Sequence, residues 1–149
     1  MDRRSLPLRM ERKDRLFAED RPLHLTAMIE ESILDRPIGG ENAPLVMREQ
    51  LRHLIDLSGR DNVEILVLPT AVGRHDGLEG RFTVLHFIDA EGRKQAQSIG
   101  YVEIPDDAVY IQDQQQVDKY TGSAELLRSV ALSQPQSVKA IKARLATLG

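Results

Sequence analysis

The stretch NVEILVLP, residues 62–69, decides the fold class, because it is almost continuously apolar and rich in β-branched and aliphatic side chains. Such a run is typical of a strand that is buried on both faces of a sheet. Upstream, the stretch PLHLTAMIEE, residues 22–31, alternates apolar residues with others at a period of two. This alternation predicts a second strand with one face better buried than the other.

The segment between these two strands, residues 43–58, has the periodicity of a helix. Met47, Leu51, Leu54 and Ile55 fall on one face at helical spacing. A strand, a helix and a second strand in this order favour a parallel pair joined by a right-handed crossover. A short helical turn is expected over residues 31–34, directly after the first strand.

Beyond residue 69 the sequence predicts three more strands and two helices. The strands are expected at 82–88, 98–104 and 108–112, and the helices at 114–132 and 135–148. The run FTVLHFI, 82–88, is as apolar as NVEILVLP and is expected to be buried on both faces in the same way. Ser133 can cap the last helix. We therefore expect an α/β fold, with about five strands in a mixed parallel and antiparallel sheet flanked by helices, two of them C-terminal.

The length of 149 residues predicts a single domain over 1–149. We divide it into a charged N-terminal helix within 1–20, a sheet-forming core over 21–112 and C-terminal helices over 113–149. The apolar stripes of the last two helices are expected to form intramolecular core, and a homodimer surface is the alternative.

Composition excludes several classes of function. The chain has no cysteine, which rules out disulfides and thiolate metal sites and agrees with a cytoplasmic location. The net charge of −3 and the aromatic content of 4% argue against direct contact with nucleic acid. No apolar run is long enough to cross a membrane, and the N-terminus lacks the pattern of a signal peptide.

The loop AVGRHDGLEGRF, residues 71–82, is the first candidate for a site. Gly73, Gly77 and Gly80 allow backbone conformations with positive φ or a close approach to another group. Because the loop leads into a strand and not into a helix, a phosphate cradle does not fit. A histidine such as His75 is a common acid–base group, but no nucleophile stands at a characteristic spacing from it. Three roles stay open for the loop. It only turns the chain, it contacts a small molecule or a partner, or it holds catalytic residues.

Acidic residues at strand ends are the second candidate. Glu31 follows the first strand. Glu103 lies in a later strand, two positions after Tyr101 in the alternating pattern. One alternative is that one of Glu30 and Glu31 caps the following turn while the other is solvated. The candidate ligand pocket comprises Glu31, His75, Asp76, Arg81, Tyr101 and Glu103. Four scattered histidines indicate no metal site, and His86 within the strand 82–88 is expected to be a satisfied core or edge histidine.

Several stretches together resemble one family. They are RMERKDRLF (9–17), MIEESILDRPIGG (28–40), VMREQLRHLIDL (46–57), NVEILVLP (62–69), HDGLEGRFTVLHF (75–87), YVE (101–103) and ALSQPQS (131–137). In this order and spacing, the chain from about residue 9 to residue 148 is similar to the C-terminal domain of actinobacterial Xre-type helix-turn-helix regulators. These are antitoxin-like, WhiJ-like transcriptional regulators, and their C-terminal part is a domain of unknown function.

The resemblance implies an effector-sensing or partner-binding role, with DNA bound by a separate module and a small partner protein encoded nearby. The recurrent residues of the family fall here on Glu31, Leu34, Gly39, Gly40, Gln50, Leu51, Pro69, His75, Gly77, Leu78, Gly80, Phe82, Tyr101 and Glu103. The chain departs from the family pattern because it lacks the helix-turn-helix and a Pro-Gly-Leu-Leu-Gln-Thr segment. We therefore expect a shortened copy or a fragment of a regulator, with apolar surface exposed where the missing segment would pack.

The expected function is that of a non-enzymatic effector-sensing or protein-interaction domain with no cofactor. Its expected partner is a small-molecule effector or a small protein. The alternative is a divergent hydrolase that uses His75 with Glu31 or Glu103 as acid–base groups. That alternative requires these side chains to lie within hydrogen-bonding reach across one cleft.

Overall fold

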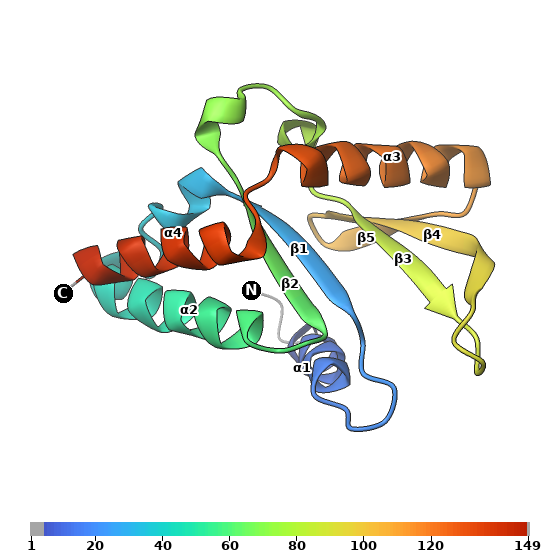
Figure 1. The fold of residues 1–149 in the computed structure, drawn as a ribbon, viewed down its shortest axis with the longest axis horizontal. Helices are drawn as coiled ribbons and strands as arrows, with labels where there is room; N and C mark the ends of the chain where they lie inside the picture. Colours follow the sequence, from blue (N-terminus) through green and yellow to red (C-terminus); the bar gives the residue numbers. More distant parts are fainter. Residues whose placement is uncertain (1–4, 149) are drawn as a thin grey trace. The chain divides into compact units, whose positions relative to one another are not determined.

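The computed structural model describes residues 5–148, with side chains from residue 10 onward, and it divides into two compact units. Unit 1 comprises Met1–Thr70 and Ala131–Gly149, and unit 2 comprises Ala71–Val130. The described residues form four α-helices and five strands, shown in Figure 1, with short 3₁₀ helices at several connections. The expected α/β class is confirmed.

Unit 1 is built on the predicted strand–helix–strand arrangement. Strands β1 (Leu25–Glu30) and β2 (Val63–Leu68) pair in parallel, and α2 (Ala43–Ser58) connects them. The 3₁₀ helix η1 (Glu31–Leu34) follows β1 at once, as expected, and η2 (Gly40–Asn42) precedes α2. Helix α2 begins and ends at the predicted residues, because its apolar stripe and its early proline agree on one conformation.

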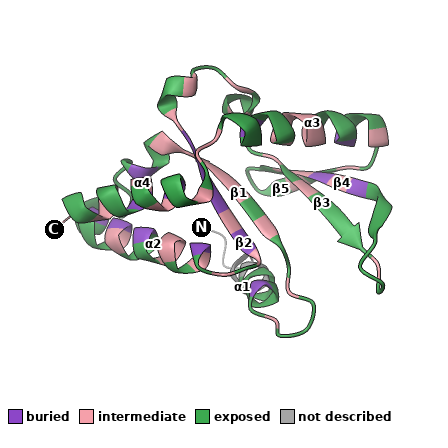
Figure 2. Ribbon diagram, viewed as in Figure 1, coloured by how far each residue is buried: buried purple, intermediate pink, exposed green. Residues whose placement is uncertain are grey.

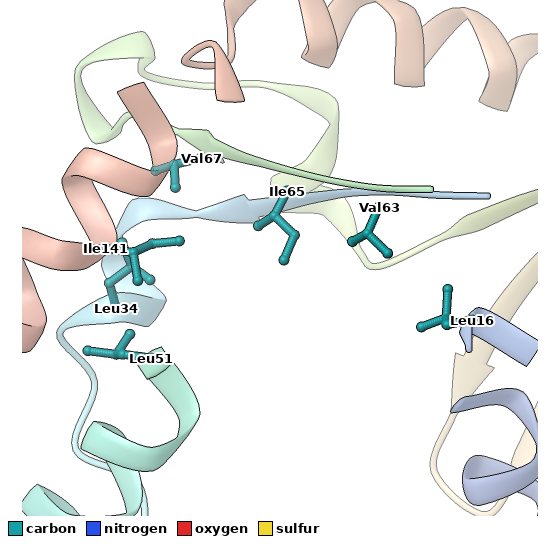
Figure 3. Packing of buried hydrophobic residues seen from close by; sticks show 7 residues of the cluster. All are labelled: Leu16, Leu34, Leu51, Val63, Ile65, Val67 and Ile141. Carbon is teal, nitrogen blue, oxygen red and sulfur yellow. The ribbon is translucent and has the colours of Figure 1, made fainter. Parts of the chain in front are cut away.

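The core of unit 1 lies between the parallel strands and the helices α2 and α4 (Gln134–Thr147). Figure 3 shows its buried members, which are Leu16, Leu34, Leu51, Val63, Ile65, Val67 and Ile141. The alternate residues of β2, Leu66 and Leu68, are 4% and 3% exposed, so this strand is buried on both faces as predicted. Each such buried aliphatic side chain stabilises the fold by about 1.5–3 kcal/mol relative to an exposed position.

The free edge of β2 is covered by the segment that leads into α4. The amide of Leu132 donates to the carbonyl of Val67 at 2.8 Å, and the amide of Val67 donates to Ser137 Oγ at 2.9 Å. Ser133 accepts from the backbone of Gln136, whose side chain accepts from the amide of Ser133 in return. This capping box confirms the predicted role of Ser133 and fixes the start of α4 beside the strand.

The N-terminal helix α1 (Ser5–Leu16) ends earlier than the predicted residue 20, and residues 1–4 of that prediction lie outside the described part. Its last residue, Leu16, reaches the core, and Asn62 donates through Nδ2 to the carbonyls of Leu16 and Leu23 at 2.9 and 2.8 Å. Among the described helices, none combines the length and apolar character needed to span a bilayer.

Unit 2 contains an antiparallel sheet and one helix. Its strands are β3 (Thr83–Ile88), β4 (Lys94–Ile104) and β5 (Asp107–Ile111), in the order β3-β4-β5, and α3 (Gln114–Val130) packs on β3 and β4. The five strands therefore form two sheets, one parallel and one antiparallel, where we expected a single mixed sheet.

The prediction that β3 is buried on both faces is wrong. Leu85 and Phe87 are 38% and 42% exposed, and Figure 2 shows most of this strand as exposed. The physical reason is that β3 is an edge strand of an antiparallel sheet, and such a sheet can leave one face open to solvent. Its apolar composition alone could not distinguish it from the buried parallel strand β2.

Candidate functional site

A guanidinium held between two carboxylates marks the carboxyl ends of the parallel strands in unit 1. Arg144, in the last turn of α4, donates through Nη2 to Glu31 Oε1 at 2.9 Å. It also donates through Nε to Asp35 Oδ1 at 3.2 Å and through Nη2 to Asp35 Oδ2 at 3.5 Å. Glu31 opens η1 and Asp35 ends it, so one short turn presents both acids to one arginine.

The second carboxylate oxygen of Glu31 reaches the other strand. Glu31 Oε2 accepts from the amide of Thr70, two residues after β2 ends, at 2.9 Å. This backbone hydrogen bond, followed by the one from Arg144, lowers the pKa of Glu31, and the bonds to Asp35 and Glu31 raise the pKa of Arg144. Glu31 is therefore held as an anion that joins the ends of β1 and β2.

A cavity of about 200 Å³ lies beside this cluster. Its polar lining is supplied by Asp35, Arg36, Arg144 and Thr147. Its apolar lining consists of Leu34, Pro37, Ala43, Pro44, Met47 and Leu148. In open α/β sheets, ligands bind in the crevice outside the carboxyl ends of the strands, and this cavity occupies that place in unit 1. An apolar wall with a few convergent polar groups is the usual composition of a ligand site.

The predicted site residues are distributed over the two units. Glu31 belongs to unit 1, whereas His75, Asp76, Arg81, Tyr101 and Glu103 belong to unit 2. The pocket that would join all six stays a prediction. Within unit 2 the residues form separate local contacts.

The loop before β3 is tied to α3 through Asp76. His75 has an extended backbone and precedes the 3₁₀ helix η4 (Asp76–Glu79), and Ser123 Oγ on α3 donates to Asp76 Oδ2 at 2.6 Å. A Cβ on Gly77 would lie 3.0 Å from Nδ1 of His75, so the histidine ring packs directly over this glycine. Gly73 and Gly80 have φ of 77° and 154°, as the turning role of the loop requires.

Tyr101 and Glu103 form a second local contact on the open face of the antiparallel sheet. The hydroxyl of Tyr101 donates to Glu103 Oε1 at 3.1 Å, and the rings of Tyr101 and Tyr110 lie 5.2 Å apart. His86 Nδ1 lies 2.7 Å from Ser98 Oγ on the neighbouring strand, and burial lowers the pKa of this histidine. His86 is thus the satisfied histidine that the sequence predicted.

Arg81, the remaining predicted residue, has an exposed side chain at the end of the loop. Across residues 5–148, no three histidine, aspartate or glutamate side chains gather in a way that could hold a metal ion.

Glu31 was predicted from the sequence as a site residue, whereas its partners Asp35 and Arg144 were not. Arg144 lies 113 positions from Glu31 in the chain, and an arginine in the last turn of a helix is ordinarily explained by the helix dipole. The only sequence signal at Asp35 was its place beside the Pro37 turn. The cavity itself combines a loop, the start of α2 and the end of α4, and no single segment predicts it.

A family model described as Domain of unknown function (DUF5753) matches residues 2–143. No curated protein and no solved structure matches the chain.

Proposed function

The chain belongs to this family of domains of unknown function, and we propose that it is a non-enzymatic effector-sensing domain. The proposed ligand is a small molecule that binds in the cavity beside Arg144. The observation that carries the proposal is the joint presence, in one concave site, of an apolar wall and a guanidinium fixed by two carboxylates.

The fixed guanidinium supports recognition because it is organised before a ligand arrives. The side chains of Arg144 and Glu31 are 28% and 27% exposed, so this pair is partly shielded from solvent. Both acids hold the planar guanidinium in one orientation, and a ligand would lose little free energy in ordering it. The lining residues Ala43 and Met47 are also nearly buried, at 8% and 7% exposure.

The hydrogen bonds of the acidic residues support a non-enzymatic role. The pKa of Glu31 is lowered, whereas a general base that works near neutrality needs a raised carboxyl pKa. The hydroxyl of Ser123 donates a hydrogen bond to the carboxylate of Asp76, whereas the serine of a nucleophilic enzyme donates to a histidine. No observation favours the alternative hydrolase.

The position of the cavity suggests how binding would be transmitted. Its lining comes from the loop after β1, from the first turn of α2 and from the end of α4. A ligand that contacts all three would stabilise α4 on the parallel strands. The resemblance of the quoted stretches to Xre-type regulators supports a role in transcription regulation, in which a separate module binds DNA. A small partner protein would then recognise whether α4 is held on the parallel strands.

A thermal-shift screen of small metabolites tests the proposal. A true ligand raises the melting temperature by mass action, by an amount that grows with ligand concentration. Thr147→Phe places an aromatic ring at the cavity, and Ala146→Phe adds the same ring at the adjacent exposed position, which does not line it. We expect the first variant to lose the shift and the second to keep it. A shift retained in Thr147→Phe, or no shift with any compound, would contradict the proposal.

A further inference from the structure

We infer that the open face of the antiparallel sheet in unit 2 binds one amphipathic, basic helix of a partner protein. The open face is defined by the side chains of Thr83, Leu85, Phe87, Ile99, Tyr101, Glu103, Ala108 and Tyr110. This surface is independent of the ligand cavity in unit 1, so either proposal can fail without the other.

The alternation of side chains along the strands identifies the open face. The ring of Phe82 lies 5.1 Å from the ring of Tyr120 on α3, so this side of β3 is covered by the helix. Thr83, Leu85 and Phe87 alternate with Phe82 and point to the opposite side. Directly opposite residues of paired strands share a face, which adds the members from β4 and β5, namely Ile99, Tyr101, Glu103, Ala108 and Tyr110.

The open face presents apolar and aromatic side chains to solvent. Leu85, Phe87 and Tyr110 are 38%, 42% and 58% exposed. The rings of Tyr101 and Tyr110 lie 5.2 Å apart on neighbouring strands and form one rigid contact surface. Neighbouring exposed apolar side chains mark interaction sites, and tyrosine is enriched among the residues that dominate binding energy.

The dimensions of the face suit a single helix. Three strands about 4.8 Å apart and six residues at about 3.4 Å each give roughly 15 by 20 Å. A helix of about 13 residues has this length and is about 10–12 Å wide. In Figure 1, α3 lies as one helix over the other face of the same sheet. Two copies of the chain that packed only these faces together would bury about 300 Å² each, whereas a stable interface buries about 800 Å² per partner.

The sheet carries a net negative charge. Residues 81–113, which contain the three strands and their turns, hold three basic and six acidic residues. Arg93 already pairs with Asp89 and Glu91, so the excess of acidic side chains lies in the rest of the segment. A basic partner is therefore attracted, and an acidic partner is repelled.

Glu103 brings this negative charge onto the open face. The hydroxyl of Tyr101 donates to Glu103 Oε1 at 3.1 Å and orients the carboxylate. Asp106 and Asp107 follow at the turn into β5, at the same end of the face. Arg81, just before β3, offsets one of these three charges and leaves this end acidic. Lysine side chains that flank the apolar stripe of a bound helix would pair with these carboxylates.

The test is a titration of the ¹⁵N-labelled full chain with a synthetic helical peptide of about 13 residues. The peptide has leucine at i, i+3, i+4 and i+7 spacing and lysine elsewhere. One comparison peptide has glutamate in place of lysine, and another has the lysine peptide's composition without helical periodicity. We expect the lysine peptide to bind about tenfold more tightly than either, with amide shift changes at the strand residues of the open face.

Two pairs of variants locate the binding. Leu85→Gln should weaken the lysine peptide about fivefold by removing exposed apolar surface, whereas Leu126→Gln, at a 67% exposed leucine on α3, should leave it unchanged. Glu103→Gln should weaken the lysine peptide a few-fold and reduce its preference over the glutamate peptide. Glu125→Gln, at an exposed position on α3, removes the same charge from unit 2 and should change neither.

The remaining outcomes contradict the inference. Absence of binding, equal binding of the three peptides, or shift changes outside the open face would each overturn it. Shift changes at the open face that depend on protein concentration, without any peptide, would overturn it in favour of a second copy of the chain as the occupant.

Discussion

The hydroxyl of Ser137 is the best point at which to test the packing of α4 on β2. Ser137 has no exposed surface, and its Oγ accepts the amide proton of Val67 at 2.9 Å and donates to the carbonyl of Leu132 at 3.3 Å. Substitution Ser137→Ala removes the acceptor and leaves a buried strand amide without a partner. We expect the free energy of unfolding to fall.

The magnitude follows from two opposing effects. An unsatisfied buried donor costs about 1–3 kcal/mol. Alanine is a better helix former than serine, and this difference raises the free energy of unfolding by about 0.5 kcal/mol. Ser129→Ala on α3 is the matched control, because its hydroxyl makes only an exposed bond to the carbonyl of Leu126. The difference between the two variants therefore isolates the buried bond, at about 1–3 kcal/mol.

Urea unfolding followed by far-ultraviolet circular dichroism measures the global effect, since the chain has no tryptophan for fluorescence. Hydrogen exchange at the amide of Val67 measures the local effect and should accelerate in Ser137→Ala. Equal stabilities of the two variants, together with unchanged protection of Val67, would refute the conclusion that Ser137 fastens α4 to the strand.

Three further predictions concern the stability of variants at Glu31, Gly122 and Gly100. Because the folded pKa of Glu31 is lowered, its contribution to stability is present above the ordinary value of 4.5 and is lost as the pH falls through the folded pKa. Glu31→Gln should lower the free energy of unfolding by about 1 kcal/mol at pH 7, a figure discounted for the partial exposure of the side chain. In urea titrations from pH 7 to pH 3, the variant should lose less stability on acidification than the unsubstituted chain does. Gly122→Ala in α3 should raise stability by about 0.5–1 kcal/mol, since the added Cβ meets nothing within 4 Å, and an unchanged or lower melting temperature would contradict this. Gly100→Ala should instead lower stability by about 1–3 kcal/mol, since its Cβ would lie 3.2 Å from Cβ of Ile111, and the melting temperatures of the two alanine variants should move in opposite directions.

Local signals in the sequence were sufficient for the helices α2 and α4. The stripe of Met47, Leu51, Leu54 and Ile55 predicted α2 within its observed bounds, and Ser133 was predicted as the cap of α4. These predictions succeed because helix periodicity and capping involve residues within one or two turns of each other.

The sequence by itself therefore determined the α/β class, the parallel pair β1 and β2, the helices, and Glu31 as a residue at a strand end. Only the tertiary structure decided that the strands form two sheets, that β3 is an open edge, and that Arg144 joins Glu31 and Asp35 beside a cavity. The physical reason is the separation of the interacting residues along the sequence. Periodicity and capping involve neighbours in the chain, whereas the ion pair between Glu31 and Arg144, 113 positions apart, forms only after the core has brought α4 against the strands.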